Sequence, residues 1–260
     1  MFTLVQSVRS EWLKQRRSFT LWLIVAGGAF IPALILGIRI LRPAGLPQIY
    51  AASGFWERLW IQCWESMSVF IMPLVIILCA SLIAQIEYRN NTWKQVHATP
   101  QPFAAIFVAK LLILVFMVVQ LLVCFSAAIY VAGIGPAIVF RHVDAPASPI
   151  PFALFLGRNA SFFVDALPIV ALQYLLALRF RNFMVPLGIG MAMWIAAIAA
   201  LPWDYNYLLP YSYLAIDYTT TVESRVKHAL PAAAPTLAFA YFVVFTAAGY
   251  VSYAWKGDKG

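Results

Sequence analysis

Long apolar stretches alternate with short polar ones along almost the whole chain. A helix needs about 20 consecutive apolar residues to cross the hydrocarbon core of a bilayer. Stretches that approach this length run over residues 19–40, 66–86, 104–133, 161–178, 184–201 and 232–255. The pattern predicts an all-α, polytopic membrane protein with six transmembrane helices.

Composition agrees with a membrane location. The chain has 260 residues, of which 63% are hydrophobic and 11% charged, more apolar surface than one soluble core hides. The net charge of +8 comes from bases spread over the polar loops. That spread is typical of membrane orientation and does not indicate a nucleic-acid partner. The bilayer is the partner we expect.

Residues 1–18 form a first part of the chain, and residues 19–260 form the membrane domain. Leu4, Val5, Val8 and Trp12 fall on one helical face, while Glu11, Lys14 and Arg17 lie largely off it. This pattern predicts an amphipathic helix in the inner headgroup layer. A solvated tail is the alternative. The first apolar run lacks a cleavage site after it, so we expect a permanent anchor.

Basic residues set the orientation. Bases precede the first span at Arg9, Lys14, Arg16 and Arg17. By the positive-inside rule the N-terminus is cytoplasmic, and six spans return the C-terminus to the same side. Asp165 is the acid placed within a predicted span, and we expect it to pair with Arg158 unless it has a transport role.

Sequence motifs for catalysis are missing. The chain holds no GxxxxGK[ST], HExxH or GxSxG pattern. Its histidines fall in separate loops, and its three cysteines have no metal-ligand spacing. We therefore expect neither an enzyme nor a cofactor or metal held by this chain.

Two polar or aromatic features stand out against the apolar background. Residues 87–102 read EYRNNTWKQVHATPQP between the second and third spans, where prolines stiffen the return and residues 91–98 suit a short helix. On the other side, Trp56, Trp60 and Trp64 form a row that predicts interfacial anchoring or, alternatively, binding of an amphiphile. The segment 203–218 is equally aromatic and carries the same alternatives.

The residues EWLKQRRSFTLWL and IAQIEYRNNTWKQVHATPQPFAAIFVAKLLIL resemble the membrane subunits of type-2 ATP-binding-cassette (ABC) exporters. The closest likeness is to lantibiotic-immunity and bacitracin-resistance permeases, which implies an antibiotic-resistance role in a bacterial inner membrane. The match covers about the first 120 residues well, and beyond them only span count and loop sizes.

The resemblance implies three contact regions. A coupling helix docks on the ATPase through Glu87, Arg89, Asn90, Asn91, Thr92, Trp93 and Lys94. A smaller cytoplasmic contact comes from Arg179, Arg181 and Asn182. The interfacial helix contributes Glu11, Lys14, Arg16 and Arg17. The implied partners are two ATP-binding subunits, which hold ATP and Mg²⁺, and a second copy or a sister permease. Residues 203–218 correspond to an extracellular re-entrant element.

Two functions follow. The first is the permease subunit of an ATP-driven exporter for an amphiphilic peptide or lipid-like molecule. The alternative is a membrane scaffold or sensor that does not transport.

Overall fold

A computed structural model describes residues 2–16, 18–89, 102–140, 143–180, 182–222 and 234–257. The described residues form helices and connecting turns. In chain order the α-helices are α1 (Phe2–Arg16), α2 (Phe19–Leu41), α3 (Leu46–Ala51), α4 (Phe55–Ser66), α5 (Met72–Arg89), α7 (Phe103–Val139), α8 (Phe152–Arg179), α9 (Met184–Ala199), α10 (Tyr213–Val222) and α11 (Ala234–Gly257). Short helical turns lie at Pro43–Gly45 and Asn206–Leu208, and a π-helix at Met67–Ile71 joins α4 to α5.

Five helical segments are long and apolar enough to cross a membrane: Phe19–Leu41, Phe55–Ile83, Phe103–Val139, Phe152–Arg179 and Pro235–Trp255. The helix α9 is apolar but shorter, with 16 residues. The second segment begins at Phe55, well before the predicted 66, and the fourth at Phe152, before the predicted 161. Polar residues such as Arg58 and Arg158 interrupt the apolar pattern there without ending the helix.

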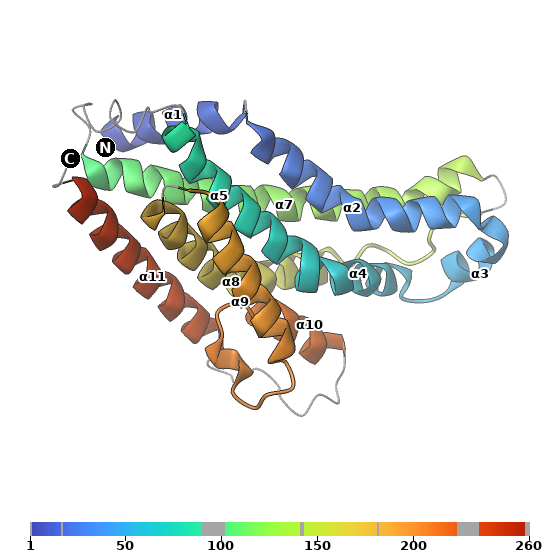
Figure 1. The fold of residues 1–260 in the computed structure, drawn as a ribbon. Helices are drawn as coiled ribbons and strands as arrows, with labels where there is room; N and C mark the ends of the chain where they lie inside the picture. Colours follow the sequence, from blue (N-terminus) through green and yellow to red (C-terminus); the bar gives the residue numbers. More distant parts are fainter. Residues whose placement is uncertain are drawn as a thin grey trace.

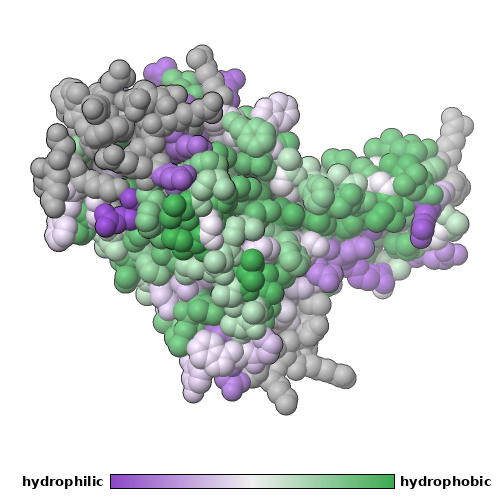
Figure 2. Space-filling model, viewed as in Figure 1, coloured by the Kyte–Doolittle hydropathy of each residue, from purple (hydrophilic) through white to green (hydrophobic). Residues whose placement is uncertain are grey.

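The ends of the chain lie together. The start of α1 and the end of α11 are at the same end of the bundle, while the far ends of α2 and α7 extend together as an arm at the opposite side (Figure 1). The surface is largely apolar in the view of Figure 2, with polar residues concentrated near the chain termini and along the arm. Such a surface suits a bilayer rather than water.

Glycine sets how closely α2 and α7 approach. A Cβ atom on Gly28 would lie 3.1 Å from the backbone oxygen of Leu121 and 3.1 Å from the backbone nitrogen of Phe125. Backbone atoms cannot move aside as a flexible side chain does. Small residues at such a contact let two membrane helices pack backbone against backbone.

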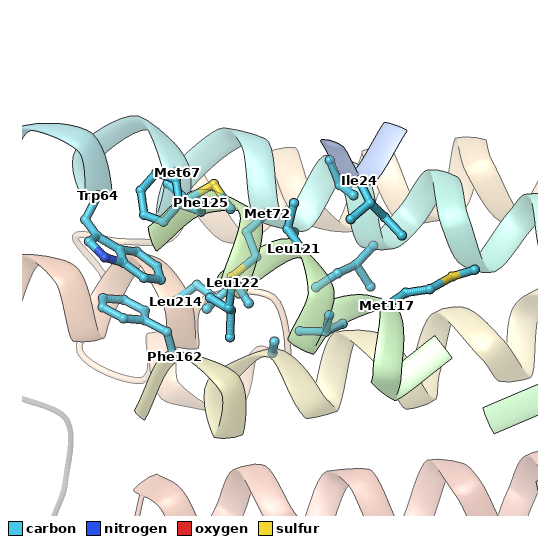
Figure 3. Close-up of a cluster of buried hydrophobic side chains, with 14 of the residues drawn as sticks. Ile24, Trp64, Met67, Met72, Met117, Leu121, Leu122, Phe125, Phe162 and Leu214 are labelled. Atoms are coloured by element: carbon cyan, nitrogen blue, oxygen red, sulfur yellow. The ribbon is translucent and has the colours of Figure 1, made fainter. Parts of the chain in front are cut away.

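The core is aromatic where α4, α7 and α8 meet. Trp64 stacks on Phe162 with ring centroids 3.9 Å apart and meets Phe125 edge-on at 5.1 Å (Figure 3). Trp56, Trp60 and Trp64 are only 4%, 2% and 0% exposed. The expectation that this row anchors the protein at the interface is therefore wrong. The row faces inward because its helix continues into α5 and packs against the bundle.

Candidate functional site

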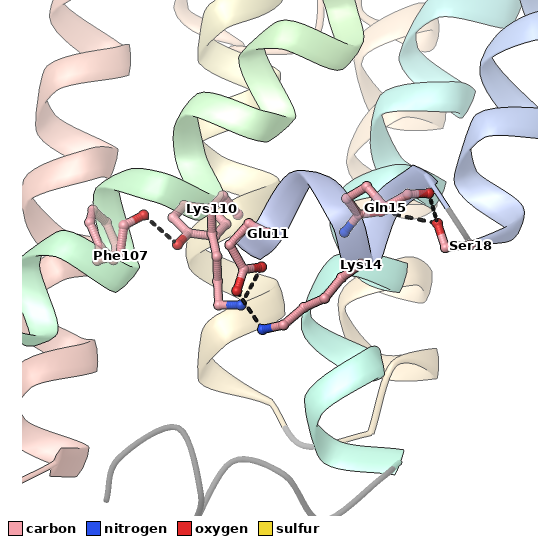
Figure 4. Close-up of polar contacts among 7 residues, drawn as sticks. Glu11, Lys14, Gln15, Ser18, Phe107 and Lys110 are labelled. Carbon is pink, nitrogen blue, oxygen red and sulfur yellow. Dashed lines mark hydrogen bonds and ion pairs between the residues drawn. The ribbon is translucent and has the colours of Figure 1, made fainter. Parts of the chain in front are cut away.

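A buried ion pair joins the first helix to the third long one. The Nζ of Lys110 on α7 donates to Oε2 of Glu11 on α1 at 2.8 Å, and the Lys110 side chain is 2% exposed. The Nζ of Lys14 reaches Oε1 of the same carboxylate at 2.5 Å from the more exposed side. Two ammonium groups therefore surround one carboxylate (Figure 4). A charge buried this deeply is tolerated only when it is paired and hydrogen-bonded.

The face of α1 that packs inward carries polar residues beside the apolar Val8 and Trp12. Ser7, Glu11 and Gln15 follow one another at helical spacing, and each is at most 5% exposed. Val5, in contrast, is 64% exposed. Glu11, which the pattern places largely off the apolar face of an interfacial helix, is instead buried. It points inward because its partner Lys110 lies on α7.

The corner between α1 and α2 is closed by side chains. Ser18 caps α2 through the backbone nitrogen of Thr20 and donates to the backbone oxygen of Gln15 at 2.8 Å. Thr20 Oγ1 donates to Gln15 Oε1 at 2.7 Å in a buried position. These bonds give α1 a defined direction relative to the first spanning helix.

A second buried network centres on Gln173 of α8. Its Nε2 donates to the backbone oxygen of Pro186 on α9 at 2.7 Å and to Ser81 Oγ on α5 at 3.3 Å. Its Oε1 accepts from the hydroxyl of Tyr211 at 2.8 Å. One amide thus joins three other segments of the chain inside the bundle. Gly190 leaves the room it needs, since a Cβ there would lie 2.6 Å from Gln173 Oε1.

The family model described as ABC-2 family transporter protein matches residues 7–197 of the chain. The chain belongs to the ABC-2 transporter family. The resemblance to type-2 ABC permeases is confirmed. The match contains Glu11, Lys110 and Gln173, so both networks lie inside the family region. A comparison with curated proteins found no match.

An ABC-2 subunit is a multi-pass membrane protein that works with an ATP-binding partner. The described helices that flank the expected docking segment are α5 and α7. Helix α5 ends at Arg89, and α7 begins at Phe103 and packs against α1. The docking role of this end stays a prediction.

The structure describes some of the residues predicted to contact the ATPase and leaves others outside its described part. Glu87 and Arg89 occupy the last turn of α5. Arg16 and Arg179 are exposed at the ends of α1 and α8, and Asn182 Oδ1 accepts from the backbone nitrogen of Met184 at the start of α9. The remaining predicted residues lie outside the described part of the chain: Asn90, Asn91, Thr92, Trp93, Lys94, Arg181 and Arg17.

Asp165 is placed differently from the prediction. Asp165 is 3% exposed, and the charge of Asp217 on α10 is near enough to act on its carboxyl group. Ser161 also donates to Asp217 Oδ2 at 3.0 Å. The expected pairing with Arg158 is therefore replaced by a carboxyl pair between α8 and α10. No local pattern predicts this neighbour, because Asp217 lies far from Asp165 in the chain, in the aromatic segment 203–218.

Sequence reasoning also missed the roles of Lys110 and Gln173. A lysine inside a long apolar run and a glutamine in a predicted span were the available signals. Polar side chains inside a membrane helix nearly always face a partner or a cavity. The partner's position, however, depends on how the helices pack.

Proposed function

We propose that the chain is the permease subunit of an ATP-driven ABC exporter that moves an amphiphilic peptide or lipid-like molecule. Two ATP-binding subunits beneath it hold ATP and Mg²⁺, and a second copy or a sister permease completes the transmembrane part. The family match and the buried ion pair between α1 and α7 support this function together.

The proposed topology has six crossings, with α9 as the short one. An even number of crossings is supported by the start of α1 and the end of α11 lying at the same end of the bundle. The bases Arg9, Lys14 and Arg16 near this end favour the cytoplasm of a bacterial inner membrane.

The proposed mechanism begins at residues 87–102. ATP binding moves the ATPase subunits, and this movement is passed to α5 and α7, which flank the docking segment. Ser81 on α5 is bonded to Gln173, which is bonded to Tyr211 of the 203–218 segment. A displacement of α5 therefore changes the hydrogen bonds that hold this segment. The ATPase can shift the equilibrium between two arrangements of the transmembrane helices only by the difference between its binding free energies for the two.

The test uses the chain with its ATPase. The tagged protein is extracted in mild detergent, and co-purification of an ATPase is expected. Charge reversal by Glu87→Lys or Lys94→Glu should then uncouple ATP hydrolysis from export while insertion stays normal. Arg42→Glu is the matched control, because Arg42 caps the end of α2 that lies away from α1. This variant should leave coupling intact. Unchanged export in both docking variants would refute the docking role, and an ATPase that never co-purifies would favour the scaffold.

A further inference from the structure

A basic cavity lies on the arm, at the side of the molecule opposite the ends of the chain. It has a volume of about 370 Å³ and lies between the end of α2 and the helices α3 and α4. Its polar lining comes from Arg39, Arg58 and Gln62, and its apolar lining includes Ile35, Ile38 and Leu59. Two guanidinium groups and several apolar side chains therefore line the same cavity.

Neither arginine is neutralised by a carboxylate of the described residues. Arg39 Nη1 donates to the backbone oxygen of Ala132 at 3.3 Å, and Arg58 Nη2 donates to the backbone oxygen of Ser53 at 2.6 Å. Each guanidinium has five N–H donors, so most remain available. Both positive charges can therefore meet an anion in the cavity.

Neighbouring aromatic rings hold Arg39 in place. Its guanidinium carbon lies 5.1 Å from the ring centre of Phe55 and 5.7 Å from that of Tyr50. Burial raises the pKa of the Tyr50 phenol, and the positive charge of Arg39 opposes that rise. The charge thus acts on a confined, partly dry environment, where it attracts an anion more strongly than in water.

The position of Arg39 along α2 matches the depth of lipid phosphates. Helix α2 begins at Phe19, and at about 1.5 Å per residue Arg39 lies about 30 Å further along. That length equals the hydrocarbon thickness of a typical bilayer, about 30 Å. Arg39 therefore reaches the headgroup boundary, while Ile35 and Ile38 lie on the side of the lipid tails. Ile38 is 60% exposed and free to contact a tail.

We propose that this cavity binds the headgroup of an anionic phospholipid. Its phosphate lies between Arg39 and Arg58, and the beginning of one tail lies on Ile35 and Ile38. Arginine suits this ligand because its planar donors match phosphate oxygens in pairs. The site does not depend on the proposed ATPase coupling, since no residue of the docking segment lines it.

The test measures lipid binding to the full chain in neutral detergent, without any ATPase. Phosphatidylglycerol is titrated, and the bound lipid is counted by native mass spectrometry. Each of Arg39→Gln and Arg58→Gln should weaken binding about fivefold, since one base near a lipid headgroup contributes about 1 kcal/mol. Phosphatidylcholine with the same tails should bind more weakly. The matched control is Arg42→Gln, an exposed base near the same helix end that does not line the cavity.

Three outcomes would overturn the proposal. The first is equal weakening by Arg42→Gln, which would indicate general attraction to a basic arm. The second is unchanged binding in Arg58→Gln. The Arg58 side chain is exposed, so this variant should fold and keeps the test decisive even if Arg39→Gln does not fold. The third is displacement of the lipid by an equal concentration of glycerol phosphate, which would show a site for the free anion.

Discussion

Glu11 and Lys110 lie 99 positions apart in the chain and meet at 2.8 Å in the interior. Their bond fixes the N-terminal helix to the helix that follows the proposed docking segment. We therefore expect a displacement of the start of α7 to move α1 as well. The hydrogen bond from Ser18 to Gln15 would pass this movement on to α2.

Removing the buried base should destabilise the protein far more than removing the exposed one. Lys110→Met leaves the Glu11 carboxylate buried with only Lys14 beside it, and we expect a loss of about 3 kcal/mol in unfolding free energy. Lys14→Met should cost about 1 kcal/mol or less, because the Lys14 side chain is 32% exposed. Titration with a denaturing detergent measures both.

A double-mutant cycle isolates the pair itself. The combination Glu11→Gln with Lys110→Met should be less destabilising than the sum of the two single changes, because no unpaired charge remains. Simple additivity would show that the two side chains do not interact.

Gln173 should be more sensitive than any one of its partners. Gln173→Leu leaves the Pro186 carbonyl, Ser81 and the Tyr211 hydroxyl without this partner, and we expect a loss of about 3 kcal/mol. Tyr211→Phe removes one bond and should cost about 1 kcal/mol. Unfolding free energies of the purified variants check the order. Equal losses would mean that Gln173 does not act as the centre of the network.

The close approach of α2 and α7 predicts a sharp difference between two glycines of one helix. Gly28→Leu places a side chain against the backbone of α7 and should destabilise by about 3 kcal/mol or more. Gly37→Leu is the matched control, since nothing lies within 4 Å of a Cβ there. Thermal unfolding in detergent compares them. A similar melting temperature for both variants would contradict the contact.

How much of this fold the sequence predicts depends on what surrounds each helix. The apolar pattern predicts the first and last spans at 19–40 and 232–255, and the structure has helices at Phe19–Leu41 and Ala234–Gly257. The agreement is close because the largely exposed faces of these helices produce continuous apolar runs. Segments packed inside the bundle tolerate polar residues, so the second and fourth spans begin earlier than the pattern indicates. Pairs such as Glu11–Lys110 depend on packing between distant helices, which no local pattern records.

The burial of the tryptophan row gives a last prediction. Trp64 is fully buried between Phe125 and Phe162, whereas Trp203 is 50% exposed. Trp64→Ala should cost about 4 kcal/mol through lost contacts and the cavity left behind. Trp203→Ala should stay within about 0.5 kcal/mol, as do most exposed substitutions. Unfolding measurements in detergent and in lipid nanodiscs decide between a core and an interfacial role. An interfacial anchor would lose stability only in nanodiscs, whereas a core residue loses it in both.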